Sequence, residues 1–200
     1  MKNKNYSAGA VKFSFWFFEF RKVIGLLHEG RSLDEIKAMN KEQNIFLAPT
    51  SARATMIFNT VSKRIQALPE TFLSLFKDSD ISTQKLMNLI AILYTDDLFF
   101  DFVYEVYREK LIIGKDTLSD SDFQVFFREK QLQSERVAKW TDETLKRLGG
   151  CYKTMLSEAG LIDNSFGSRK ILRPIFNPIL DDWLKSNNME QLLCAFMGVR

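Results

Sequence analysis

The chain has 200 residues, enough for one large domain or two small lobes, and its 46% hydrophobic content is sufficient to bury a core, which excludes a disordered chain. Phenylalanine is abundant, with 18 residues, whereas 9 glycines and 4 prolines are too few for a turn-rich β-sandwich or barrel. We therefore expect an all-α, mainly helical protein.

The net charge of +3 is unevenly distributed along the chain. Residues 1–80 carry a net charge of +4, residues 81–130 carry −3, and residues 131–200 carry +2. An excess of this size permits nucleic-acid binding without requiring it, because a solvated surface of mixed charge has a similar composition. The basic ends are therefore the segments in which a nucleic-acid contact is sought.

Neither the cysteines nor the apolar start of the chain predicts an extracellular or membrane protein. Cys151 and Cys194 are too few for a disulfide framework, which is typical of a reduced, cytoplasmic chain. The apolar run from Phe13 to Leu27 is interrupted by three ionised side chains, so we expect neither a signal peptide nor a membrane span. Buried core is the preferred interpretation of this run, and a helix lying on a membrane surface is the alternative.

The first helices follow from apolar periodicity and capping residues. Apolar side chains recur at three- and four-residue steps from Phe13 to Leu27, which predicts a helix, although a strand over the first five residues is an alternative. Ser32 and Glu35 have the spacing of a capping box, so a second helix is expected to begin there and to reach about Gln43.

A connector from Asn44 to Pro49 and a helix from Ser51 to about Leu68 complete a candidate helix-turn-helix. The third helix has an apolar stripe, and beside it a polar, partly basic face that can bond phosphates and base edges. The connector is longer than the usual three or four residues, so a plain helical hairpin is an equal alternative. The predicted DNA-binding residues of this module are Ser51, Arg53, Asn59, Lys63 and Arg64.

The central segments predict the core. After a short helix from Pro69 to Lys77, residues 86–94 are apolar on nearly all sides, and residues 98–113 are rich in phenylalanine. Helices with so little polar surface must be covered by neighbouring helices. We place a boundary between two lobes near residues 115–133, giving an N-terminal helical lobe of residues 1–118 and a C-terminal lobe of residues 119–200.

The second lobe has the element order of a winged helix. A short helix at 134–139, a long helix from Thr141 to residues 156–162, a basic strand pair at 169–176 and further helices are expected. The three cations of the strand pair have no acidic residue near them between residues 164 and 180. Winged helices bind DNA or proteins, and both remain open here. The predicted DNA-binding residues of this module are Lys139, Thr141, Lys146, Arg147, Lys153, Arg169, Lys170 and Arg173.

No recognisable catalytic or cofactor motif is present. The single histidine, His28, is interpreted as a residue near a helix C-terminus, and no phosphate-binding loop or dinucleotide fingerprint occurs. Asp96, Asp97 and Asp101 could bind a divalent ion, but their positions fit helix capping better. We therefore expect no enzyme activity, no metal, no cofactor and no small-molecule substrate.

Five segments of the sequence form a pattern that is spread over nearly the whole chain: Tyr6–Ala10, the aromatic first helix, Leu33–Lys37, Thr50–Arg53 and Leu156–Ile162. Together they resemble the BrxA family, the small proteins of bacterial BREX phage-exclusion systems. The resemblance implies a helical, non-enzymatic protein that binds double-stranded DNA and acts beside the methyltransferase and ATPase components of an antiphage operon. It transfers no individual functional residue, so the DNA-binding residues above come from charge and helix geometry alone.

The predicted mechanism is electrostatic docking on the duplex with weak sequence preference, in which Lys and Arg neutralise phosphates and Ser, Thr and Asn fix the pose. The partners expected are double-stranded DNA and other BREX proteins. A protein–protein adaptor that assembles a larger defence complex is the alternative, and an RNA-binding helical bundle is a third.

Overall fold

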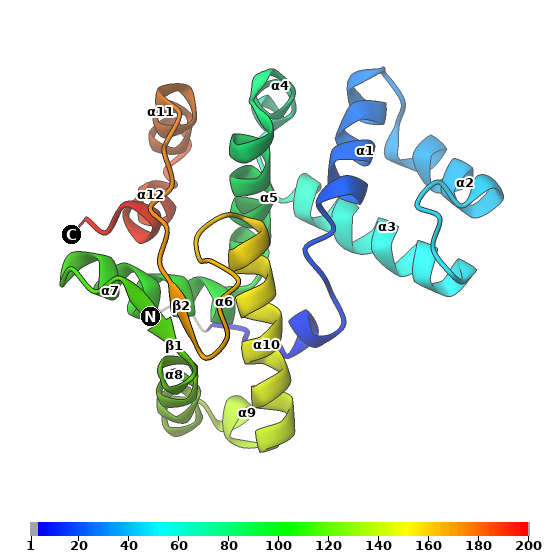
Figure 1. Cartoon of the computed structure of the whole chain (residues 1–200). Coiled ribbons are helices and arrows are strands. Elements are labelled where there is room, and N and C mark those ends of the chain that lie inside the picture. Colours follow the sequence, from blue (N-terminus) through cyan, green and yellow to red (C-terminus); the bar gives the residue numbers. More distant parts are fainter. Residues whose placement is uncertain (1–3, 200) are drawn as a thin grey trace. The chain divides into compact units, whose positions relative to one another are not determined.

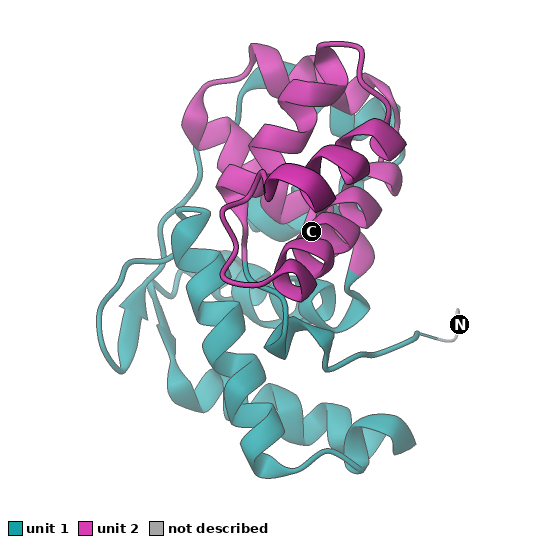
Figure 2. Cartoon of the chain, turned by 90° about the vertical axis from the view of Figure 1, so that its right-hand side faces the viewer, with its two compact units in different colours: residues 1–14, 96–200 teal, residues 15–95 magenta. Residues whose placement is uncertain are grey.

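A computed structural model describes residues 4–199 of the chain, which folds into two compact units (Figures 1 and 2). Unit 2 is Phe15–Thr95, and unit 1 comprises the chain up to Ser14 and from Asp96 onward. These bounds differ from those of the lobes expected from the sequence, 1–118 and 119–200. Within the described residues, no helix combines the length and the apolar character needed to cross a membrane.

Unit 2 is a helical bundle built around one buried helix. Its elements are α1 (Phe17–His28), α2 (Leu33–Gln43), α3 (Ser51–Gln66), α4 (Thr71–Asp78) and α5 (Ile81–Thr95). Helix α5 packs against α1, α3 and α4, and every residue from Leu86 to Leu93 is buried. The prediction that the apolar helix around residues 86–94 is covered by neighbouring helices is therefore confirmed.

Helix α1 begins at Phe17, so the prediction of a helix from Phe13 is wrong. Trp16 adopts the left-handed conformation, with φ 49°, and this breaks the helical path. The carbonyl of Phe15 accepts hydrogen bonds from Arg64 Nη1 at 3.2 Å and from Asn88 Nδ2 at 2.8 Å. Buried polar partners from two other helices thus fix the chain in a conformation that the apolar period alone does not reveal.

The connector between α2 and α3 is held by its own side chains. The capping box of Ser32 and Glu35 at the start of α2 is confirmed. At the end of α2, Asn44 has φ 45°, donates from Nδ2 to the carbonyl of Ala48 at 2.7 Å, and accepts from the Ala48 amide at 3.0 Å. Thr50 then caps α3 by accepting from the Arg53 amide. The predicted helix, long turn and helix are present.

Unit 1 surrounds a cluster of stacked aromatic rings. Phe99 stacks on Tyr152 at 4.1 Å between ring centres, and Phe102 stacks on Phe123 at 4.3 Å. These contacts join α6 and α8 with α10. The elements of this unit are η1 (Gly9–Val11), α6 (Asp97–Phe102), the π-helical η2 (Val103–Tyr107), α7 (Arg108–Ile112), β1 (Thr117–Ser119), α8 (Asp120–Gln133), α9 (Glu135–Ala138), α10 (Asp142–Glu158), β2 (Ser168–Lys170), α11 (Pro178–Ser186) and α12 (Glu190–Met197).

A buried charge cluster attaches the N-terminal segment to unit 1. Asp101, 2% exposed, accepts from Tyr6 Oη at 2.6 Å, from Lys4 Nζ at 2.5 Å and from Lys130 Nζ at 3.2 Å. Lys130, 3% exposed, also donates to Glu105 on the π-helical turn at 2.7 Å. Burial, together with the neighbouring carboxylate, raises the pKa of Tyr6 to about 12. Two acidic residues of the middle segment, Asp101 and Glu105, are therefore paired with lysines inside unit 1. Asp101 thus has a structural role in the interior of this unit.

The sheet of unit 1 pairs two strands that are far apart in sequence. β1 and β2 are antiparallel, with Leu118 opposite Arg169, and an additional antiparallel bridge joins Ile162 to Ile171 (Figure 1). The fold class is confirmed as mainly helical with one short antiparallel sheet. The expected strand at 169–176 is shorter, and its main partner is β1 within residues 115–119, where no strand was expected. Pro174 cannot donate to a ladder, whereas the side chain of Leu118 is fully buried and fixes β1.

Candidate nucleic-acid interface

The polar face of α3 is largely exposed. Ser51, Asn59 and Lys63 are all exposed, in accordance with their helical spacing. Arg53 is half-buried, and its guanidinium lies 5.0 Å from the centre of the Trp16 ring, a cation–π contact that fixes its direction. Three of the five predicted residues of this module are thus available to a ligand, and a fourth is partly engaged.

Arg64 is the residue of this module that the structure removes from the interface. Its side chain is 4% exposed, its Nη1 donates to the carbonyl of Phe15, and its guanidinium lies 5.7 Å from the Trp16 ring centre. The eleven-residue spacing of Arg53 and Arg64 places both on the same face of an ideal helix. In the structure, however, Phe15 and Trp16, directly before α1, contact Arg64 and bury its side chain. The prediction that Arg64 binds DNA is therefore corrected: this residue anchors the bend at Trp16.

In the second module, α8 and the short α9 lead into the long helix α10. Thr141 caps α10 by accepting from the Thr144 amide at 3.3 Å, so its hydroxyl is engaged locally. Lys139, Lys146 and Arg147 are exposed, and the last lies on a line with Gly150 and Thr154 along the outer side of α10. The helix continues through Gly149 and Gly150 without a break.

Asp120 forms ion pairs with two of the predicted DNA-binding residues, Lys153 and Arg169. Its Oδ1 lies 2.5 Å from Lys153 Nζ and 3.2 Å from Arg169 Nη1, at the start of α8. The hydrogen bond from Lys153, with the charges of both cations, lowers the pKa of Asp120 below its ordinary value. The expectation that the strand carries uncompensated charge is therefore wrong for Arg169, because its partner comes from residue 120, outside the local sequence.

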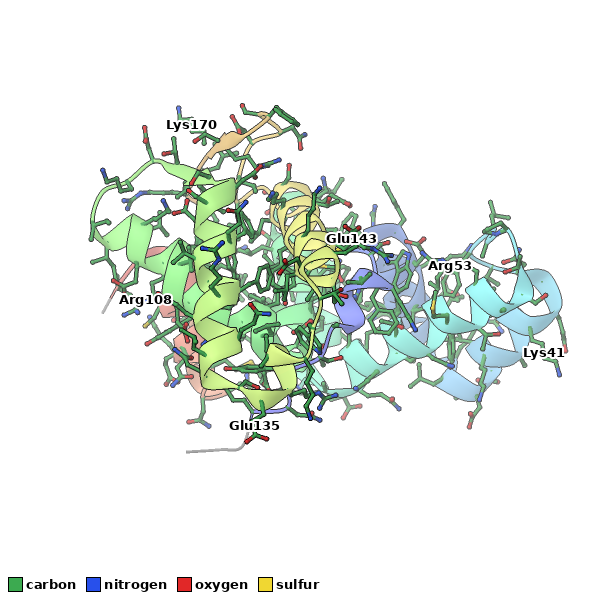
Figure 3. The ribbon with its side chains drawn as sticks, turned by 90° about the horizontal axis from the view of Figure 1, so that it is seen from below. Lys41, Arg53, Arg108, Glu135, Glu143 and Lys170 are labelled. Carbon is green, nitrogen blue, oxygen red and sulfur yellow. The ribbon has the colours of Figure 1, made fainter. Side chains whose placement is uncertain are left out.

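The remaining cations of the strand segment differ in availability. Arg173 donates from Nη2 to the carbonyl of Leu111 at 3.2 Å, so part of its guanidinium is used inside the unit. Lys170 is exposed at the end of β2, and Figure 3 shows it at the outer edge of its unit. Within residues 4–199, no carboxylate is found at ion-pair distance from Lys139, Lys146, Arg147 or Lys170.

Two grooves in unit 1 contain cations that the sequence did not single out. One, of about 440 Å³, runs between α8 and α10 over Phe123 and Phe127, and Arg128 joins Lys146 and Lys153 in its lining. The other, of about 610 Å³, has Lys4, Arg136 and Lys139 in its lining, with Glu135 beside them. Arg128 and Arg136 had no sequence signal beyond their charge, since each has an acidic neighbour in the chain.

The other titratable side chains singled out include two buried tyrosines and one surface histidine. Burial raises the pKa of Tyr107 and of Tyr152, and the Tyr107 hydroxyl donates to the Leu172 carbonyl at 3.0 Å. His28 Nε2 lies 2.6 Å from Lys77 Nζ on the surface of unit 2. In the part of the chain that the structure describes, no three His, Cys, Asp or Glu residues are grouped so as to hold a metal ion.

Comparisons with known proteins give consistent results. The sequence model of the family BrxA matches residues 4–188. A protein of Bacillus cereus (strain H3081.97), named BREX protein BrxA, is 39% identical over 161 residues, which cover 80% of this chain and 80% of that protein. The crystal structure of an uncharacterized protein from Magnetospirillum magneticum has a TM-score of 0.81 and 18% identity, covering 98% of this chain and 100% of that chain. At that identity the structural likeness concerns the fold alone.

Proposed function

The chain belongs to the BrxA family of BREX proteins, and on this premise we propose that it is a non-catalytic, cytoplasmic protein of bacterial antiphage defence that binds double-stranded DNA. In this role it docks on the duplex largely through phosphate contacts and works beside other BREX proteins. The surface used is the outer side of α10 together with the turn and strand that follow it.

The order and pairing of the elements from Thr117 to Ile171 carry the proposal. Strand β1, helices α8, α9 and α10, the bridge residue Ile162 and strand β2 follow one another as in a winged helix. In that arrangement the third strand pairs with both the first strand and the second, as residues 168–171 do with 117–119 and with 162. Helix α10 then takes the position of the recognition helix, and the turn at 163–167 together with strand β2 is the wing.

Charge on this surface supports a phosphate contact. Lys139, Lys146, Arg147 and Lys170 are exposed cations without a carboxylate partner among residues 4–199. Each cation that neutralises a phosphate releases a counterion, so binding weakens as salt is added. Asp142 and Glu143, in the first turn of α10, oppose close approach of that end of the helix to phosphates. We therefore place the main contact over the middle of α10 and the wing.

The helix-turn-helix of unit 2 is proposed as a second, separate contact. Ser51, Asn59 and Lys63 are its exposed polar residues, with Arg53 beside them, whereas Arg64 no longer belongs to it. Of the residues assigned to this module, Lys63 is an exposed cation and Arg53 is a half-buried one, so this module is expected to add less to affinity than unit 1.

A gel-shift titration of duplex DNA at two salt concentrations tests the proposal. Four phosphate contacts predict that affinity falls about 150-fold between about 50 mM and about 200 mM salt, from a slope of about −0.9 per contact in a double-logarithmic plot. Competition with single-stranded DNA and with double-stranded RNA separates duplex DNA binding from the RNA alternative. Absent retention of the duplex, or retention that does not change with salt, would reject the proposed function.

A protein–protein adaptor is the second candidate, supported by apolar exposure in unit 1. Ile175, before α11, is 96% exposed, and Ile179, in the first turn of α11, is 65% exposed. A stable complex with another BREX protein that survives nuclease treatment and is unchanged in the triple variant Arg169→Ala, Lys170→Ala, Arg173→Ala would favour the adaptor over the DNA-binding role.

A further inference from the structure

The turn between Ile162 and β2 carries one large side chain that contributes nothing to the packing of the unit. Phe166 is 98% exposed, the largest exposed fraction among the exposed large hydrophobic residues described. It lies at the tip of the turn, immediately before Gly167, whose φ of +79° reverses the chain into β2. Single exposed apolar residues are common on protein surfaces, so exposure alone identifies no role.

What distinguishes Phe166 is that its turn is braced from within. Asp163 Oδ1 accepts from the Ser165 amide at 3.2 Å and from the Lys170 amide at 2.9 Å, and Asp163 Oδ2 accepts from Ser165 Oγ at 2.7 Å. The Ser168 amide donates to the Phe166 carbonyl at 3.0 Å, and Ser157 Oγ on α10 donates to Asn164 Oδ1. These hydrogen bonds hold the backbone of the turn, so the Phe166 ring points away from the protein and does not fold back onto its surface.

The surroundings of the tip favour nucleic acid as the occupant. Lys170, four residues away on the same ribbon, is an exposed cation without a carboxylate partner among the described residues, and the Asp163 carboxylate accepts three hydrogen bonds from within the turn. A protruding apolar side chain near an exposed cation matches the chemistry of a minor-groove wedge, in which Phe, Leu, Ile or Met inserts between base pairs and kinks the duplex.

We propose that Phe166 is an apolar wedge that inserts into the minor groove of duplex DNA and partly unstacks one base step while Lys170 contacts the adjacent phosphate. The inference rests on the proposed DNA-binding function and adds to it a residue and a mode of contact. Pyrimidine–purine steps are the easiest to unstack, so the wedge gives the protein a preference for deformable sequences without reading base edges.

The test uses the full chain and short duplexes that carry 2-aminopurine in place of adenine at a central TpA step. The wild-type protein is expected to raise the fluorescence of 2-aminopurine on binding, because the base is unstacked. Phe166→Ala is expected to abolish that rise and to weaken binding about tenfold, within the range found when an aromatic stacking contact is removed. Phe166→Leu keeps an apolar wedge and is expected to retain most of the fluorescence rise.

Leu132→Ala is the matched control, because Leu132 is also apolar and 89% exposed but lies near the end of α8. The variants at residue 166 remove no packing contact, so circular dichroism and melting temperature are expected to match the wild type. Wild-type binding without any fluorescence rise, or equal effects of Phe166→Ala and Leu132→Ala, would overturn the wedge while leaving the proposed function intact. Failure of the wild type to bind duplex overturns both. Loss of a protein partner, but not of DNA, in Phe166→Ala would assign the ring to a protein contact instead.

Discussion

Replacing the three exposed cations on α10 and the wing gives the sharpest prediction from this structure. The variant carries Lys146→Ala, Arg147→Ala and Lys170→Ala, which removes three of the four cations assigned to phosphates in unit 1. All three side chains are exposed, so the substitutions cost little folding free energy. We expect the variant to remain folded and to bind duplex DNA much more weakly.

The magnitude follows from counterion release. Each phosphate contact contributes about −0.9 to the slope of the logarithm of affinity against the logarithm of salt concentration, so losing three contacts makes the slope shallower by about 2.7. Between about 50 mM and about 200 mM salt, the fourfold change predicted for one remaining contact replaces the roughly 150-fold change predicted for four. Any contribution from Lys63 in unit 2 adds equally to both proteins, so the difference in slope is unaffected.

Fluorescence anisotropy with a labelled duplex at four or more salt concentrations measures both slopes. The control variant Arg21→Ala, Arg31→Ala, Lys77→Ala removes the same formal charge from exposed positions in α1, before α2 and in α4, outside both proposed DNA-contacting modules. Its slope is expected to remain that of the wild type. If the two variants change the slope equally, net charge governs binding, and the assignment of the contact to α10 and the wing is refuted.

Three further predictions concern the charged groups that the structure places in the interior or in ion pairs. Arg64→Ala is expected to lower the free energy of unfolding by about 2 kcal/mol, because it removes a buried hydrogen bond to the Phe15 carbonyl, and to leave duplex affinity unchanged. Chemical denaturation measures the stability and fluorescence anisotropy the affinity. A stable variant with weakened DNA binding would contradict this prediction. Lys130→Met removes one of the cations that balance the charge of the buried Asp101, and it is expected to lower the free energy of unfolding by about 3 kcal/mol, measured by urea unfolding. An unchanged stability would show that Lys4 and Tyr6 are sufficient to balance the Asp101 carboxylate. Asp120 has a lowered pKa in the fold, so its stabilising contribution is present above its unfolded pKa of about 4 and is lost as the pH falls through the folded value. Asp120→Asn is therefore expected to lose less stability than the wild type on acidification from about pH 5 to about pH 2. It is also expected to bind duplex DNA more tightly at neutral pH, because Lys153 and Arg169 lose their carboxylate partner. Unchanged affinity would argue against a role for those two cations in DNA binding.

Much of the fold followed from local sequence signals. The capping box at Ser32 and the predicted start of a helix at Ser51 each gave a helix start within one residue of the observed one, because caps satisfy backbone donors locally. The start of α1 was predicted wrongly because Trp16 takes a left-handed conformation. That conformation depends on Arg64 and Asn88, which are distant in sequence. Strand β1 was missed because three residues carry too little periodicity to be recognised.

The candidate site was less predictable than the fold. Charge and helical spacing correctly indicated exposed cations such as Lys146 and Arg147, since exposure on an amphipathic helix follows from its period. They could not reveal that Asp120 pairs with Lys153 and Arg169, because that contact joins three separate elements. Phe166 was not singled out from the sequence, because nothing in the local sequence indicates that its ring will be held clear of the core.

Photo-crosslinking from defined positions tests the central claim most directly, namely that α10 and the wing face the duplex. A photoreactive amino acid placed at position 147 or 170 is expected to crosslink to bound DNA, in amounts that fall as salt is raised, whereas the same group at position 77 on α4 is expected to give little product. Crosslinking from position 77 with none from 147 or 170 would contradict the account, because the duplex would then lie on a different surface of the protein.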